Sequence, residues 1–245
     1  MPKKRKKTSW MNKSTSPFLY NGFFQINKPK DWTSFKVVDY IKRKFKFKKV
    51  GHAGTLDPFA TGLLVILVNN YTKKFSDFLK FDKEYNALVQ LGKITDTYDI
   101  DGKVIEEYKD KIKIDKKSIL KTIKLFEGEI IQKPPAFSAL KVSGTPAYKL
   151  ARQGKDVDLA SRIVVIKNIN LIDVNKDSFS INVLCSSGTY IRSLAFDIGK
   201  SLKYGGYLSN LERIRIGDYR LTDAKELDKI TIEDLHVMKD FGLNI

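Results

Sequence analysis

The N-terminal half of the chain alternates short apolar segments of strand character with segments of helical period. Residues 22–27 predict a strand, and the continuous apolar run 63–68 predicts a buried one. Between them, apolar residues at helical spacing predict a basic amphipathic helix capped by Thr33 or Ser34. The apolar face of this helix is expected to carry Phe35, Val38, Ile41 and Phe45. The other elements expected in this half are a helix at 71–81 and strands at 84–91 and 103–107.

The C-terminal half continues this mixture of helices and strands. Helices are predicted at 115–127, 146–153 and 190–202, and strands at 130–138, 163–174, 179–186, 207–214 and 217–221. Pro134 and Pro135 lack the N–H group that a ladder bond needs, so their strand should lie at a sheet edge or a bulge. The irregular order of elements, without a βαβ repeat, predicts an α+β fold on a mixed or antiparallel sheet.

Charge is the strongest compositional signal. The 245 residues contain 45 Lys plus Arg against 28 Asp plus Glu, and the resulting net charge of +17 favours a polyanionic partner. Residues 1–13 hold six of the cations and no acid, which is typical of a flexible arm that strengthens nucleic-acid binding or of a nuclear-import signal. The rest of the chain remains basic without this arm, although scattered lysines can also serve solubility alone.

The numbers of cysteines and histidines and the length of the longest apolar run argue against a disulfide-bonded protein, a metal site and a membrane helix. The single cysteine, Cys185, cannot form an intrachain disulfide and fits the reducing cytoplasm. The two histidines, His52 and His236, are far apart and form no metal-binding motif. The run 63–68 is much shorter than the roughly 20 residues of a membrane helix. We therefore expect a cytoplasmic protein without a metal site.

Residues 51–62 form a glycine-containing segment directly before the apolar strand. They read Gly-His-Ala-Gly-Thr-Leu-Asp-Pro-Phe-Ala-Thr-Gly and contain one carboxylate, Asp57. Three glycines permit positive φ or close approach of a ligand, and Pro58 restricts Asp57 to extended conformations. The segment is either an ordinary turn in which Asp57 bonds nearby amides or a loop that directs a reactive carboxylate. It matches neither a P-loop nor a dinucleotide-binding loop.

Extended by two leucines, the run 51–64 closely resembles the active-site motif of the TruB family, the bacterial tRNA pseudouridine-55 synthases. The likeness continues in the family's order through Asn-Lys-Pro at 27–29, Lys-Glu-Tyr at 83–85, the Thr-Asp-Thr segment within 92–101, Gln-Lys-Pro-Pro-Ala-Phe-Ser-Ala-Leu-Lys at 132–141 and Gly-Thr-Tyr-Ile-Arg-Ser-Leu at 188–194. It covers about residues 22–221. The resemblance implies a pseudouridine-synthase-like fold, with a mixed, mainly antiparallel sheet, flanking helices and an active-site cleft.

The resemblance also implies a reaction, the isomerisation of uridine 55 in the T-loop of tRNA to pseudouridine. The base is flipped out, leaves its N-glycosidic bond, rotates and rejoins the ribose through carbon 5, so no cofactor and no metal are expected. By resemblance, Asp57 is the nucleophile and adds either to C1′ of the sugar or to the uracil ring. Arg192 matches the arginine that pairs with it and favours its charged form. Tyr85 matches the tyrosine that stacks on the extracted base.

Five further residues are expected, by resemblance, to bind the substrate. His52 should help to position the flipped nucleotide, and Leu211 should line an apolar pocket, although a loop histidine and a core leucine are the plain alternatives. The other three are Lys28, Gly54 and Thr55, which belong to matched motifs. Two groups of cations are expected to track phosphates collectively: Lys36, Lys42, Arg43, Lys46, Lys48 and Lys49, and then Lys141, Lys149, Arg152 and Lys155.

We expect a flexible basic arm at 1–17, a catalytic domain at 18–222 and, at 223–245, only a short segment in place of the full PUA-like RNA-binding module that related enzymes commonly carry. The expected partner is folded tRNA, bound by a monomer without a membrane, a guide RNA or an obligate protein. Two alternatives remain open: a non-catalytic RNA-binding protein or tRNA-folding chaperone, and the guide-RNA-dependent archaeal and eukaryotic branch of the superfamily. Thr95-Asp96-Thr97 favours the bacterial type over the latter.

Overall fold

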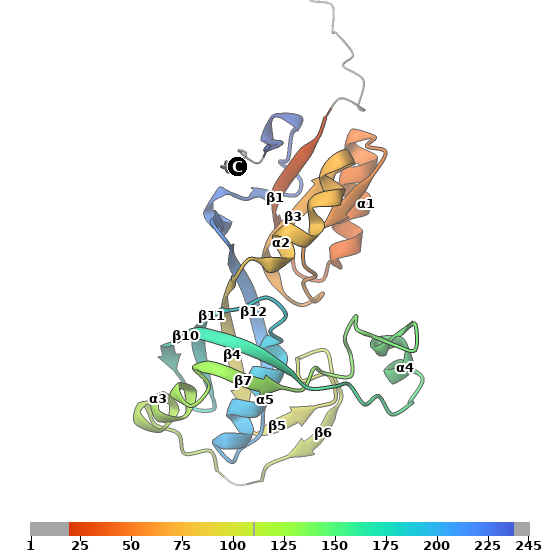
Figure 1. Ribbon diagram of the computed structural model, residues 1–245. Helices are drawn as coiled ribbons and strands as arrows, with labels where there is room; N and C mark the ends of the chain where they lie inside the picture. Colours follow the sequence, from red (N-terminus) through yellow and green to blue (C-terminus); the bar gives the residue numbers. More distant parts are fainter. Residues whose placement is uncertain (1–19, 110, 238–245) are drawn as a thin grey trace, which may run out of the picture.

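The computed structural model describes residues 20–109 and 111–237 and is built on a ten-stranded sheet (Figure 1). In chain order its strands are β1 (Gly22–Lys28), β2 (Val50–His52), β3 (Thr61–Val68), β4 (Lys83–Leu91), β7 (Gly128–Gln132), β10 (Arg162–Val174), β11 (Ser178–Cys185), β12 (Gly206–Ile216), β13 (Tyr219–Arg220) and β14 (Lys225–Glu226). The spatial order is β14-β1-β3-β12-β4-β11-β10-β7, with β13 beside β12 and β2 beside β3. Only β1 with β14 and β3 with β12 pair in parallel among these described strands, which confirms the predicted mixed, mainly antiparallel sheet.

The helices and two small hairpins surround this sheet. They are α1 (Ser34–Phe45), the 3₁₀ helix η2 (Asn69–Lys74), α2 (Phe75–Lys80), α3 (Lys116–Lys124), α4 (Ala147–Arg152), α5 (Ile191–Ser201), the 3₁₀ turns η3 (Leu221–Asp223) and η4 (Ile232–Asp234), and the hairpins β5 (Lys93–Thr95) with β6 (Val104–Glu107) and β8 (Lys141–Val142) with β9 (Thr145–Pro146). The single helix predicted at 71–81 is instead η2 followed by α2. Strand β7 lies at the sheet edge, as predicted, but it ends at Gln132, so the predicted strand at 130–138 was wrong beyond that residue, where the prolines cannot donate ladder bonds.

Helix α1 begins as predicted, because the Thr33 side chain accepts a hydrogen bond from the Lys36 amide at 3.0 Å. The prediction for Phe35 was wrong, since 73% of its surface is exposed. The buried position is taken by Ser34, whose hydroxyl accepts from the Leu56 amide at 2.9 Å and donates to the Leu56 carbonyl at 3.1 Å. Neighbouring residues lie about 100° apart around a helix, so Phe35 is turned outward.

Strand β3 is buried on both faces, as the apolar run predicted. Alternate residues of the strand join two separate apolar clusters, one that includes Val37 and Ile41 of α1 and one that includes Phe78 of α2. Every residue from Leu63 to Val68 is at most 1% exposed. The loop that precedes β3 is therefore attached to the most deeply buried strand of the N-terminal half.

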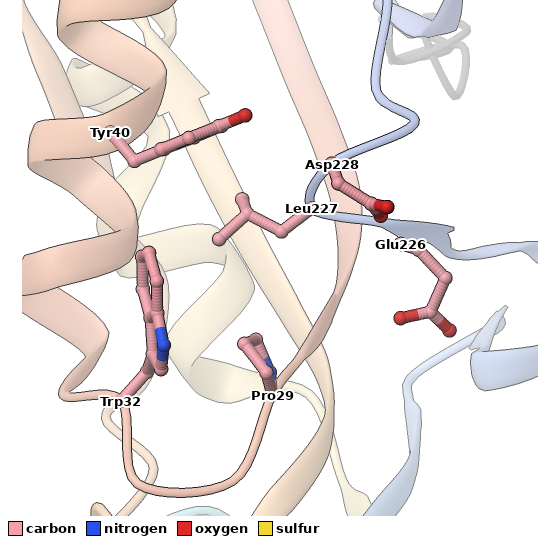
Figure 2. Close-up of a pocket in the computed structure, with 6 residues that line it drawn as sticks. All are labelled: Pro29, Trp32, Tyr40, Glu226, Leu227 and Asp228. Carbon is pink, nitrogen blue, oxygen red and sulfur yellow. The ribbon is translucent and has the colours of Figure 1, made fainter.

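The segment after β13 packs on the outer edge of β1. Strand β14 pairs with β1 in parallel, and His236 forms an isolated bridge with Phe23. Figure 2 shows Leu227 of this segment facing Trp32 and Tyr40, with which it lines a hollow of about 240 Å³.

The predicted arm at 1–17 lies outside the described residues. Within 20–109 and 111–237, no helix is long and apolar enough to cross a membrane.

Candidate functional site

Asp57 lies in a loop between β2 and β3 that is shorter than the predicted 51–62. Gly51 and His52 belong to β2, and Gly62 belongs to β3, so the loop itself spans 53–60. Gly54 and Gly62 have φ values of 95° and 101°, which favour glycine, whereas Gly51 needs no such freedom. A Cβ on Gly62 would also clash with the backbone of Arg213, so this glycine allows β3 and β12 to approach closely.

Arg192, in the first turn of α5, holds Asp57 with two nitrogens. Its Nε lies 2.9 Å from Oδ2 and its Nη2 donates to Oδ1 at 3.2 Å. The arginine side chain is 5% exposed and the aspartate side chain 30% exposed. One hydrogen bond and a second close contact with a buried guanidinium fix the direction of the carboxylate. The structure thus brings together two residues that are 135 positions apart.

Arg192 is itself held by three groups besides Asp57. Its Nη1 donates to the Thr97 carbonyl at 3.0 Å, and its Nη2 donates to the Phe137 carbonyl at 3.0 Å. Asp99 lies with Oδ2 3.3 Å from Nη1, and its side chain is 7% exposed. Burial raises the pKa of Asp99, while a 2.6 Å hydrogen bond from the Thr97 hydroxyl and the charge of Arg192 favour the ionised form. The guanidinium therefore lies between two carboxylates.

Tyr85 of β4 lies opposite Arg213 of β12 in the antiparallel pair. Arg213 is 1% exposed and donates to three backbone carbonyls, those of Leu63 at 2.8 Å, Gly54 at 3.1 Å and Thr55 at 3.4 Å. Burial raises the pKa of Tyr85, so its phenol is neutral near pH 7. Arg213 thus connects the Asp57 loop with Tyr85.

Leu211 lies two residues before Arg213, opposite Ala87 of β4. It is 5% exposed and belongs to the apolar cluster that contains Tyr85 and Leu56. The structure therefore places Leu211 in the same core cluster as Tyr85.

Lys28, at the end of β1, is fully buried. Its ammonium group donates to the carbonyls of Trp32 at 2.6 Å, Pro29 at 2.8 Å and Pro58 at 3.1 Å. Burial lowers the pKa of Lys28 to about 8. Because Pro58 follows Asp57 directly, this lysine supports the loop from the protein interior and does not lie among the groups that face solvent.

The other expected binding residues lie in or next to the loop and are less buried. Gly54 is half-buried and Thr55 is exposed. His52 is half-buried, and its Nδ1 is buried without a hydrogen-bond partner within the described part of the chain. Burial, followed by the charge of Arg213, lowers the pKa of His52, so the imidazole is neutral near pH 7. All ten cations of the two expected phosphate-tracking groups are exposed.

Known proteins resemble this chain over most of its length. Residues 42–191 match the model of the TruB family pseudouridylate synthases, N-terminal domain. The chain is 47% identical over 222 residues to tRNA pseudouridine synthase B of Bacteroides fragilis, and the match covers 86% of this chain and 95% of that protein. It is 43% identical to tRNA pseudouridine synthase B of Aquifex aeolicus, covering 85% of this chain and 73% of that protein. The chain belongs to the TruB family.

Solved structures support the family assignment at the level of the fold. A complex of Cbf5, Nop10 and Gar1 contains a chain that matches with a TM-score of 0.65 and 28% identity over 84% of this TruB-family chain. An H/ACA RNP bound to a substrate RNA containing 2′-deoxyuridine matches with a TM-score of 0.64 and 27% identity over 86% of it. This chain spans about half, 52%, of each of those chains.

Sequence reasoning missed two charged residues of this TruB-family site, Asp99 and Arg213. Asp99 lies in the matched segment 92–101, but two other aspartates of that segment, Asp96 and Asp101, have the same local character. Arg213 lies in a basic segment, and nothing in the local sequence distinguishes it from Arg215 two positions later. The signal that separates these residues from their neighbours is burial, which the folded chain alone reveals.

Within 20–109 and 111–237, no cluster of His, Cys, Asp and Glu could hold a metal ion.

Lys28→Met is expected to lower the free energy of unfolding by about 1–3 kcal/mol, because three carbonyls lose a buried donor. Urea denaturation measures this change. Lys30→Met, which removes an exposed cation two residues away, is the matched control and should change stability by less than about 0.5 kcal/mol. Equal stability of the two variants would show that the buried ammonium does not hold the loop.

Proposed function

We propose that this protein converts uridine 55 in the T-loop of tRNA to pseudouridine, with Asp57 as nucleophile. The single observation that supports this most strongly is the two-point contact of Arg192 with Asp57, in a loop that matches the family motif. The names of the relatives, tRNA pseudouridine synthase B, support a tRNA uridine as the substrate.

The reaction needs a nucleophile, a place for the base and a path for one proton. The bond between C1′ and N1 breaks, a bond between C1′ and C5 forms, the C5 proton leaves and N1 gains a proton. The Asp57 carboxylate adds either to C1′ or to the uracil ring, and both routes need it ionised and directed. Arg192 directs the carboxylate through its two contacts with the oxygens of Asp57. The bonds are only rearranged within one nucleotide, so the reaction is redox-neutral.

The base has to leave the RNA stack before it can react, which costs a few kcal/mol. In our proposal, Tyr85 and Leu211 provide an aromatic and an apolar surface for the extracted base, and His52 helps to hold the nucleotide. Stacking on an aromatic ring is worth about 1–3 kcal/mol per base, so Tyr85 offsets much of this cost. Arg213 holds the Asp57 loop through hydrogen bonds to the Gly54 and Thr55 carbonyls and lies opposite Tyr85 on the neighbouring strand.

The proposed substrate is bare folded tRNA, bound by a monomer without a guide RNA, an obligate protein or a membrane. Ten exposed cations in two groups, one on and after α1 and one around α4, provide a surface for phosphates. The structural neighbours come from H/ACA complexes, in which the corresponding chain is assembled with other components. Bare tRNA as sole substrate therefore separates this proposal from the guide-dependent type of enzyme.

Release of tritium from tRNA labelled at C5 of uridine tests the proposal, because forming the new carbon bond expels that label. We expect release with tRNA alone, stoichiometric with one uridine, and a labelled T stem-loop should react as well. No release from intact folded tRNA would refute the proposed activity. Release only after addition of a guide RNA would assign the protein to the guide-dependent type.

Asp99→Asn is expected to lower kcat for tritium release about 10- to 100-fold, because a neutral amide holds Arg192 less firmly at 3.3 Å. Binding of tRNA should change little, since Asp99 is buried beside the arginine. Asp101→Asn, two residues away and exposed, is the control and should react like the wild type. Equal rates for both variants would remove Asp99 from the positioning of Arg192.

A further inference from the structure

Two exposed phenylalanines line one groove beside the strand that leads into the Asp57 loop, and nothing in the reaction described above uses them. Phe35 of α1 is 73% exposed and Phe75 of α2 is 42% exposed. Both line a hollow of about 410 Å³ whose other walls include Val38 and Val50. Figure 1 shows α1 and α2 in the same half of the molecule, and the hollow joins them to β2. We call this hollow the α1–α2 groove.

His52 lies in the wall of the α1–α2 groove and connects the groove with the loop that carries Asp57. Its Nδ1 is buried inside the protein and is not exposed to the groove. The imidazole lies five residues before Asp57, a path of at most about 18 Å along the chain.

The surroundings of the α1–α2 groove are basic. Lys49 directly precedes Val50, and Lys73 and Lys74 directly precede Phe75. Two acids are near these cations: Asp39 of α1 is paired with Arg43 at 2.9 Å, and Asp77 of α2 follows Phe75 by two positions. Aromatic side chains among cations are the combination with which proteins bind unstacked bases of single-stranded nucleic acid.

We propose that the α1–α2 groove binds an unpaired base of the RNA substrate other than the reacting uridine, stacked against Phe35 and Phe75. This inference rests on the proposed function, because the same RNA must reach Asp57. The groove adjoins the loop that carries Asp57 through His52, so one folded RNA loop reaches both places. The second contact makes affinity depend on a base that the reaction does not alter.

The direct test measures the Kd of a fluorescently labelled tRNA T stem-loop by anisotropy. Phe35→Ala and Phe75→Ala are each expected to raise Kd about 10-fold, with a similar rise in KM for tritium release. Phe35→Trp should bind like the wild type, because the stacking surface is kept. Leu125→Ala removes an equally exposed apolar side chain, 71% exposed, at the end of α3, and serves as the control with unchanged Kd. Urea denaturation confirms that each variant is folded.

A coupling experiment identifies the base. Stem-loops with an abasic site at one loop position in turn are bound to the wild type and to Phe35→Ala. At one position outside the reacting uridine, the abasic site should weaken binding to the wild type about 10-fold and add nothing in the variant. Unchanged Kd in both alanine variants, or equal abasic losses in wild type and variant at every position, would overturn the inference. Tritium release by the wild type is scored separately, so failure of the proposed reaction is distinguishable.

Discussion

Asp57→Asn is expected to reduce tritium release from C5-labelled tRNA by more than about 10⁴-fold, while the Kd for tRNA stays within about threefold of the wild type. The amide has nearly the same shape but is no nucleophile, and removal of a covalent catalyst costs enzymes many orders of magnitude. The substituted amide would retain a neutral hydrogen bond to Arg192, so the folded site should persist. Single-turnover kinetics with excess enzyme measure the chemical step directly.

Asp82→Asn is a matched control for this substitution. Asp82 is an aspartate of similar exposure, 33% against 30%, and it also pairs with a cation, Lys167, at 2.6 Å. The control removes one surface ion pair and should leave the rate and the Kd unchanged. Substantial isomerisation by Asp57→Asn, with the control normal, would refute the nucleophile assignment. Loss of tRNA binding in Asp57→Asn would instead indicate that the carboxylate serves binding.

Arg192→Met is expected to lower kcat by more than about 10³-fold and the free energy of unfolding by about 3 kcal/mol. The substitution leaves the Asp57 and Asp99 carboxylates without their shared cation and removes the donor to the Thr97 and Phe137 carbonyls. Breaking a buried ion pair from one side is costly because the remaining charge stays buried. Tritium release and urea denaturation measure the two effects.

A second substitution keeps this prediction testable if the methionine variant fails to fold. Arg192→Lys keeps the positive charge but loses the planar fork that contacts both oxygens of Asp57, so we expect a folded protein with kcat lowered about 100-fold. Arg215→Met is the matched control, since Arg215 forms a half-buried pair with Glu84 at 2.7 Å and has no contact with Asp57. A lysine variant with wild-type kcat would show that charge alone suffices.

The elements with a strong period were the ones that the sequence predicted well. The apolar run 63–68 became β3, and the alternating segment 84–91 became β4 with alternate residues buried. The error at Phe35 has a physical cause. Ser34 forms hydrogen bonds with the Leu56 backbone and takes the buried position, so α1 turns a different face to the core than the spacing of its apolar residues predicts. The spacing of apolar residues predicts which helix face is buried, but it cannot predict that a hydrogen-bonded serine will be buried there.

The sequence by itself determined the family, the mixed sheet and the loop that presents Asp57, because these depend on local patterns and on one contiguous motif. Only the tertiary structure decided that Asp99 and Arg213 belong to the site and that Phe35 lines a groove. Arg213 bonds loop residues 158 and 159 positions earlier, and Arg192 contacts Asp57 from 135 positions away. Whether a charged side chain is buried beside another depends on how distant strands pair, and the local sequence carries no record of that pairing.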